Sequence, residues 1–245
     1  MSLRITLATA GRVLTQLRRD HRTAALLLVV PSVLMVLLRY VFHDSPQTFD
    51  RIGLPLLGVF PFVTMFLVTS VAMLRERTSG TLERLLTTPL HKLDLLLGYG
   101  IAFAVAAALQ AGIATVVAYR FLGLETAGSA WLVVGVAIAN AVLGMSVGLF
   151  VSAFAQSEFQ AVQFMPAVAL PQVLLCGLLA PRDEMAGWLQ AASDVMPMTY
   201  AVDALTEIGA HGELTGALSR DVTVVAGAAV AFLVLGAATL RRRTP

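Results

Sequence analysis

The chain has few charged residues, one cysteine and one lysine. Only 13% of its 245 residues are charged, whereas 58% are hydrophobic, which is far more than a soluble core of this size requires. The single cysteine, Cys176, excludes an internal disulfide and a cysteine-based metal cluster. We interpret Cys176 itself as a small buried apolar residue.

The sequence also lacks the short motifs that carry ATP binding, hydrolysis or metal chemistry. No G-x-x-x-x-G-K-[ST] loop is present, and the only lysine, Lys92, follows Pro-Leu-His without a glycine-rich turn. No G-x-S-x-G elbow occurs, and the four histidines lack the H-E-x-x-H spacing of a zinc helix. We therefore expect this chain to bind no cofactor or metal and not to be an enzyme by itself.

Long apolar windows dominate the sequence. A membrane-spanning helix needs about 20 apolar residues to cross a hydrocarbon core of about 30 Å. Six windows qualify: Thr23–Phe42, Ile52–Leu74, Leu95–Tyr119, Trp131–Phe154, Phe159–Leu179 and Val222–Leu240. The sequence thus predicts an all-α integral membrane protein with six transmembrane helices in a single domain, residues 1–245.

The distribution of basic residues predicts the orientation. Lys and Arg are retained on the cytoplasmic side of a membrane. If both termini are cytoplasmic, 12 of the 17 basic residues lie on that side. These are Arg4, Arg12, Arg18, Arg19, Arg22, Arg75, Arg77, Arg84, Lys92, Arg241, Arg242 and Arg243. Most acidic residues then lie outside, so the reverse topology fits poorly.

Two segments outside the spans have helical periodicity. In residues 1–22, apolar residues recur every three or four positions while arginines occupy other faces, which predicts an amphipathic helix on the inner leaflet. The alternative is an unstructured tail whose arginines only set the topology. Residues 180–221 predict short helices at the outer interface, because two apolar stripes there are separated by Pro197.

A dense charged segment, residues 75–92, separates the second and third windows. Leu82, Leu85 and Leu86 form one apolar face of a short helix with Glu83 and Arg84 at its rim. Gly80 permits a tight turn before this helix, and Pro89 ends it. The pattern favours docking into a groove of another protein, although an ordinary cytoplasmic turn is the alternative.

The string Glu76-x-x-x-Gly80-Thr81-Leu82-Glu83-x-Leu85-x-x-x-Pro89 resembles the signature that follows the second helix of ABC-2 type transporter permeases. This family includes drug-resistance and polysaccharide or Nod-factor export permeases. The later runs Leu174–Pro181 and Met196–Tyr200 resemble a second, less specific landmark of the family. With the six-span plan, the resemblance covers nearly the whole chain.

The resemblance implies a half-size permease that pairs with a second permease copy or a homologous permease. Two cytoplasmic ABC ATPase subunits, carrying ATP and Mg, would dock on the cytoplasmic loops. The residues that would couple ATP hydrolysis to the membrane are Arg75, Glu76, Arg77, Gly80, Thr81, Leu82, Glu83, Leu85 and Pro89. The amphipathic N-terminal helix would brace them. The family's passage is lined by the second and fifth helices.

Aromatic and methionine side chains on these two helices are candidates for a substrate path, because such side chains form an adaptable apolar surface. The candidates are Phe60, Phe62, Met65, Phe66, Phe164, Met165 and Leu175. Lipid contact or core packing is the alternative for each of them. Likewise, Gly144-x-x-x-Gly148 in the fourth window predicts a close helix contact, either within the chain or between subunits.

These observations favour the membrane subunit of an ATP-driven exporter in a bacterial plasma membrane, working by alternating access. The abundance of arginine and alanine suggests a GC-rich bacterial genome. An apolar path suits an amphipathic drug-like or lipid-like substrate. The alternatives are a polysaccharide or glycolipid export permease and a non-ABC channel, for which the spans provide no ring-forming acidic or carbonyl-rich filter.

Overall fold

The computed structural model describes residues 2–80 and 92–239, and every regular element within them is helical. The elements are α1 (Leu3–Arg19), α2 (His21–Val41), α3 (Pro46–Thr78), α5 (Lys92–Phe121), α6 (Ala130–Val151), α7 (Glu158–Leu175), the 3-10 turn η1 (Arg182–Glu184), α8 (Gly187–Asp194), α9 (Pro197–Ala210) and α10 (Gly216–Thr239). The prediction of an all-α chain is confirmed for these residues. The short helices expected within residues 180–221 are η1, α8 and α9.

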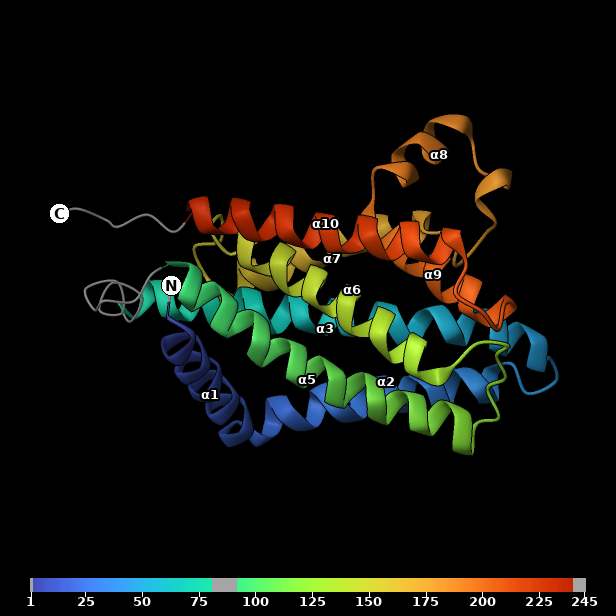
Figure 1. Ribbon diagram of the computed structural model, residues 1–245, viewed down its shortest axis with the longest axis horizontal. Coiled ribbons are helices and arrows are strands. Elements are labelled where there is room, and N and C mark those ends of the chain that lie inside the picture. Colours follow the sequence, from blue (N-terminus) through green and yellow to red (C-terminus); the bar gives the residue numbers. More distant parts are fainter. Residues whose placement is uncertain (1, 81–91, 240–245) are drawn as a thin grey trace.

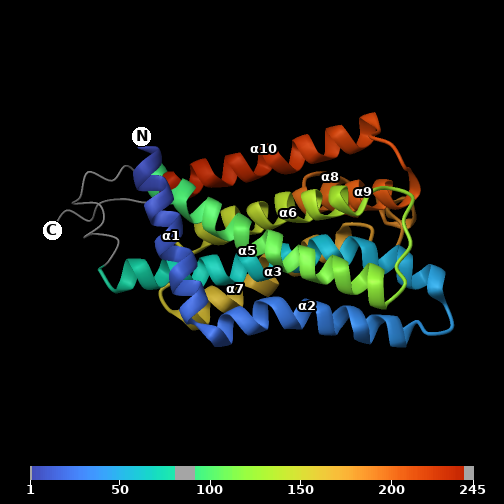
Figure 2. The ribbon, with the colours of Figure 1, turned by 60° about the horizontal axis from the view of Figure 1, so that its bottom comes forward.

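The long helices form an elongated bundle, and α1 crosses one end of it (Figures 1 and 2). At this end α3 finishes, α5 starts and α10 finishes. The end also carries Arg12, Arg75 and Arg77, so we call it the basic end. Helices α8 and α9 lie toward the opposite end of the bundle.

Five described helices are long and apolar enough to cross a membrane, by length and composition alone. They are α2, α3, residues Asp94–Phe121 of α5, α6 and α10. Helix α7 is not among them, because its 18 residues include Glu158, three glutamines and two prolines, which lower its hydropathy. It ends at Leu175, before the predicted end at Leu179, and Gly177 follows with a φ of 87°. A positive φ is incompatible with continuing a right-handed helix.

Helices α3 and α6 pack in direct backbone contact. A Cβ atom added to Gly144 would overlap the backbone oxygen of Phe62, and one added to Gly148 would lie 2.5 Å from that of Phe66. Only glycine permits this approach. The Gly144-x-x-x-Gly148 pattern therefore serves packing within the chain, as one of its two interpretations predicted.

Helix α3 continues through Pro55 and Pro61, and a side chain of α6 bonds to the turn that precedes Pro61. Pro61 has no N–H to donate to the preceding turn, and its ring crowds that turn. The Nδ2 of Asn140 donates to the carbonyl oxygen of Gly58 at 3.0 Å. Asn140 is completely buried, so this bond ties α6 to the turn of α3 that precedes Pro61.

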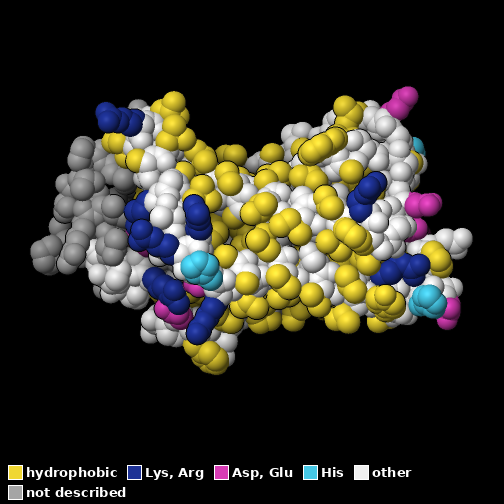
Figure 3. All heavy atoms as spheres, turned by 90° about the horizontal axis from the view of Figure 1, so that it is seen from below, with side chains coloured by type: hydrophobic (Ala, Val, Ile, Leu, Met, Phe, Trp, Pro, Cys, Tyr) yellow, Lys and Arg dark blue, Asp and Glu magenta, His cyan; other side chains and the backbone are white. Residues whose placement is uncertain are grey.

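The surface reflects the same arrangement. On the face in Figure 3, hydrophobic side chains cover the middle of the bundle and charged side chains gather near its two ends. Helix α2 contributes several exposed apolar residues: Leu26, Val29, Val33 and Leu37. Such a wide apolar surface is unfavourable in water and requires a bilayer or another chain against it.

Candidate functional site

The basic end is organised around a buried carboxylate. Glu76, in the last turns of α3, is 7% exposed, and its Oε1 accepts hydrogen bonds from Arg12 Nη1 at 2.9 Å and Tyr99 Oη at 2.8 Å. Arg12 belongs to α1 and Tyr99 to α5. Burial by itself would lower the pKa of the Arg12 guanidinium, but the neighbouring Tyr99 and Glu76 raise this pKa above its ordinary value. A charged hydrogen-bond network thus joins three helices where α3 approaches its end.

The first turns of α1 are held on α5 by a second carboxylate. Asp94 Oδ1 accepts from the backbone N–H of Ser2 at 3.2 Å and from Thr6 Oγ1 at 3.3 Å. A Cβ added to Gly98 would lie 2.6 Å from the side chain of Thr9, so α1 lies directly against the α5 backbone. The amphipathic segment is therefore a helix that is fixed to the bundle.

Two arginines connect the end of α3 to other helices. Arg75 makes a bidentate ion pair with Glu158 at the start of α7, with Nε–Oε1 at 2.7 Å and Nη2–Oε2 at 2.9 Å. The Nη2 of Arg77 donates to Thr239 Oγ1 at 3.2 Å, at the end of α10. The end of α3 therefore contacts α1, α5, α7 and α10 through side chains that belong to the predicted coupling set.

The remaining coupling residues fall mainly outside the described part of the chain. Gly80 follows α3 with a φ of 71°, the left-handed conformation that glycine tolerates without strain. No atom lies within 4 Å of a Cβ added there, so the backbone conformation, not packing, is the constraint at this position. Five predicted coupling residues lie outside the described residues: Thr81, Leu82, Glu83, Leu85 and Pro89.

The candidate path residues divide into two groups. Phe62, Met65 and Phe66 are 0% exposed and are enclosed by the bundle, where the backbone of α3 meets α6. The other four are partly buried: Phe60, Phe164, Met165 and Leu175. The structure thus does not bring the seven side chains together on one open surface, and their role as a substrate path remains a prediction.

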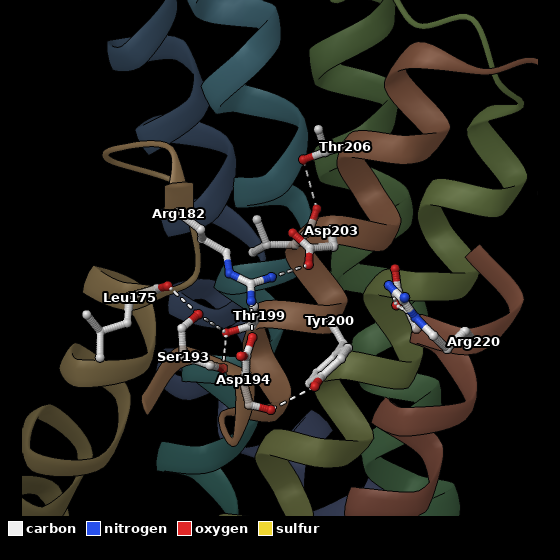
Figure 4. A network of polar contacts seen from close by, with 11 residues as sticks. Leu175, Arg182, Ser193, Asp194, Thr199, Tyr200, Asp203, Thr206 and Arg220 are labelled. Atoms are coloured by element: carbon white, nitrogen blue, oxygen red, sulfur yellow. Dashed lines mark hydrogen bonds and ion pairs between the residues drawn. The ribbon is translucent and has the colours of Figure 1, made fainter. Parts of the chain in front are cut away.

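A second polar network lies at the opposite end, within residues 175–203 (Figure 4). Arg182 lies between two carboxylates, pairing with Asp194 and, through Nη1 at 2.9 Å, with Asp203 Oδ2. Ser193 Oγ donates to the Leu175 carbonyl oxygen at 2.8 Å. Burial raises the pKa of the Asp203 carboxyl, and the charge of Arg182 partly opposes this shift. These bonds fix η1, α8 and α9 onto the end of α7.

Sequence patterns did not reveal either network's partners. The sequence places Arg182, Asp194 and Asp203 beyond the spans but does not pair them, because each lies on a different element. The signal that pointed to Glu76 was its place in the charged segment, whereas nothing in the local sequence identified Arg12 or Tyr99 as its partners. Such contacts between distant segments become visible only in the folded chain.

A bundle of membrane-length helices, with a shorter helix across its charged end, is the architecture of a multi-pass membrane protein. The chain belongs to the ABC-2 type transporter family, whose family model matches residues 5–208. Membership makes this chain a permease-type, multi-pass membrane protein.

Several curated relatives are similar to this chain. The probable doxorubicin resistance ABC transporter permease protein DrrC of Mycobacterium tuberculosis is 25% identical over 247 residues, covering 97% of this chain and 88% of that protein. The probable multidrug ABC transporter permease YbhR of Escherichia coli is 26% identical over 153 residues, covering 62% and 42%. ABC transporter G family member 20 of Dictyostelium discoideum is 24% identical over 170 residues, covering 69% and 23%. The chain thus spans less than half the length of the latter two relatives.

Proposed function

We propose that this chain is the membrane permease of an ATP-driven exporter that moves an amphipathic drug-like or lipid-like cargo out of the cytoplasm. The observation that carries the proposal is the network at the end of α3, where Glu76, at the start of the charged segment, joins α3 to Arg12 of α1 and Tyr99 of α5. Movement applied to this segment would pass into α1, α3 and α5 together. The names of DrrC and YbhR, which refer to doxorubicin resistance and to a multidrug ABC transporter, support a drug-like cargo.

The proposal places the basic end in the cytoplasm and gives the chain six crossings in a bacterial plasma membrane. The direction of α7 supports the sixth crossing: its first residue, Glu158, pairs with Arg75 at the basic end, whereas the carbonyl oxygen of its last residue, Leu175, accepts from Ser193 in α8. Helix α1 would then lie at the inner interface as a brace, with its arginines near anionic headgroups.

The energy for transport would come from ATP hydrolysis by partner subunits. Two ABC ATPase subunits, with ATP and Mg bound to them, would dock on the segment that follows α3, and a second permease would complete the passage. Closure of the ATPases on nucleotide would move the segment, and the permease pair would alternate between inward-open and outward-open states. The network around Glu76 would make α1 follow α3 during this movement.

Complex formation tests the partnership. The full chain, purified from membranes with its cognate ATPase subunit and placed in lipid nanodiscs, is expected to hydrolyse ATP faster when an amphipathic cargo is added. The ATPase subunit alone serves as the control. Failure of the two proteins to copurify, together with an unchanged rate of hydrolysis, would reject the proposed function.

Cysteine accessibility tests the orientation. In a Cys176→Ala background, Ser79→Cys at the end of α3 is expected to react with an impermeant thiol reagent only after the cells are lysed. Glu213→Cys, before α10, is expected to react in intact cells, because Glu213 is exposed at the opposite end. Labelling of Ser79→Cys from outside would reverse the orientation and remove the basis for ATPase docking at this end.

A further inference from the structure

A pocket of about 430 Å³ lies at the basic end, between α1, α2, α3, α5 and α7. Its inner wall is apolar and includes Leu67, Val68 and Val71 of α3, Phe103 of α5 and Val162 of α7. Its volume falls within the range of about 300–1,000 Å³ that is typical of small-molecule sites. Phe62 and Phe66 do not line this pocket, and their side chains are buried in a cluster with residues of α6, α7, α9 and α10.

Polar groups gather at the rim that α1 and α2 contribute. Gln16, Asp20 and Thr23 line this part of the pocket, and Arg75 lines it from α3. A pocket with an apolar wall and a few polar groups at one side fits a molecule with an apolar body and one polar head.

The charges at this rim favour a positive head group. The charge of Arg75 is opposed mainly by its bidentate pair with Glu158, and Asp20 contributes a weaker attraction. Asp20 caps the start of α2, where its carboxylate accepts from the backbone N–H of Thr23 at 3.2 Å and from Thr23 Oγ1 at 2.7 Å. These bonds lower the pKa of the Asp20 carboxyl, so it is ionised at neutral pH. Among the described residues that line the pocket, Asp20 and Arg75 are the ionised ones, and the nearby arginines Arg18, Arg19 and Arg22 are not part of the lining.

The pocket also contacts the network around Glu76. Tyr99 forms part of the pocket wall, and its hydroxyl donates to Glu76 Oε1, which also pairs with Arg12. A molecule in the pocket would therefore press on a side chain that holds α1, α3 and α5 together. This contact provides a direct route from occupancy to the end of α3.

We propose that this pocket binds an amphipathic organic cation, with the apolar body against α3, α5 and α7 and the positive group beside Asp20. The inference rests on the proposed function, which places the basic end, and with it the pocket, on the cytoplasmic side. The pocket is then the site where the cargo first binds. It assigns this binding to Leu67, Val68, Val71 and Asp20 instead of the enclosed Phe62, Met65 and Phe66.

Direct binding to the full chain tests the inference without ATP hydrolysis. The probes are radiolabelled tetraphenylphosphonium, a lipophilic cation, and tetraphenylborate, an anion of the same shape, each titrated onto the chain in neutral-lipid nanodiscs with empty nanodiscs as background. Val68→Trp fills the pocket and is expected to abolish saturable binding of the cation. The matched control is Val234→Trp on the exposed face of α10, which is expected to leave it unchanged.

Removing the charge separates head-group recognition from apolar binding. Asp20→Asn keeps a side chain that caps a helix well, so α2 is preserved. The dissociation constant for the cation is expected to rise roughly two- to fivefold, as for the loss of an exposed ion pair, while that for the anion does not rise. Asp44→Asn, an exposed acid beyond the end of α2, is the charge control and is expected to change neither constant.

Each of these measurements either supports or overturns one part of the proposal. Unchanged cation binding in Val68→Trp would overturn the pocket, and equal weakening of both probes by Asp20→Asn would overturn the preference for a cation. Saturable binding that follows the expected pattern in a chain that forms no complex with an ATPase would support the pocket and reject the proposed function. The two proposals can therefore fail separately.

Discussion

Gly80→Val is expected to lower cargo-dependent ATP hydrolysis by the assembled transporter roughly tenfold while leaving the chain in the membrane. Gly80 has a φ of 71° and no neighbour within 4 Å of an added Cβ, so the variant is strained by its backbone and not by a clash. A left-handed conformation costs a non-glycine residue about 1–2 kcal/mol, and a β-branched side chain tolerates it poorly. A conformational cost of this size corresponds to roughly a tenfold decrease in the fraction of molecules in which the turn at Gly80 has the conformation needed for coupling.

Gly80→Asn is the control for this prediction. Asparagine has a side chain of similar bulk but adopts the left-handed conformation far more readily than other non-glycine residues. We expect Gly80→Asn to retain most of the activity, measured as cargo-stimulated ATPase rate in nanodiscs at matched permease content. Equal activity of the valine and asparagine variants would show that the turn at Gly80 does not position the segment.

Glu76→Ala is expected to uncouple the transporter more severely, because it removes the acceptor that joins α1 and α5 to the end of α3. Hydrogen bonds to charged groups stabilise by about 1.5–3 kcal/mol each. The effect here should lie toward the lower end, because the Arg12 side chain is 37% exposed and can be hydrated when its partner is lost. We expect a lower melting temperature of the purified chain and a loss of stimulation of roughly tenfold or more, since about 1.4 kcal/mol corresponds to a factor of ten.

A double-mutant cycle provides the specificity control. If Arg12 acts through Glu76, the double variant Arg12→Ala/Glu76→Ala should be no worse than Glu76→Ala, so the effects of the two changes on melting temperature and on ATPase stimulation should not add. Additive effects would mean that the two side chains contribute independently. In that case, the link between α1 and α3 would not depend on this ion pair.

The sequence predicted most of the helical architecture because apolar windows and charge distribution are local signals. It anticipated the close contact at Gly144 and the short helices of residues 180–221, since small-residue spacing and apolar stripes are visible within a single segment. The ends of the apolar windows predicted the ends of the helices less accurately. Helix α3 extends to Thr78, beyond the predicted end at Leu74, because its last turns are polar yet remain helical through contacts with other helices.

The site was predicted only where its residues lie within one motif. Glu76 stood out in the charged segment, but its partners Arg12 and Tyr99 lie on other helices, and no local pattern links them. The enclosed position of Phe62 and Phe66 was equally hidden, because an apolar residue facing a passage and one facing α6 have the same sequence signature. The pocket beside Asp20 is formed by five helices, so its shape arises only from their packing.

ATP-dependent uptake into inside-out membrane vesicles tests the account's central claim, that this chain is the permease of an ATP-driven exporter coupled through the basic end. Vesicles that contain the chain and its cognate ATPase subunit are supplied with a fluorescent amphipathic cation, with and without ATP. We expect ATP to drive accumulation of the cation inside the vesicles, and Gly80→Val and Glu76→Ala to lower the rate of this accumulation roughly tenfold or more at equal protein levels. ATP-dependent accumulation that is unchanged in both variants would contradict coupling through this end, and its absence in the parental vesicles would contradict export of such a cargo.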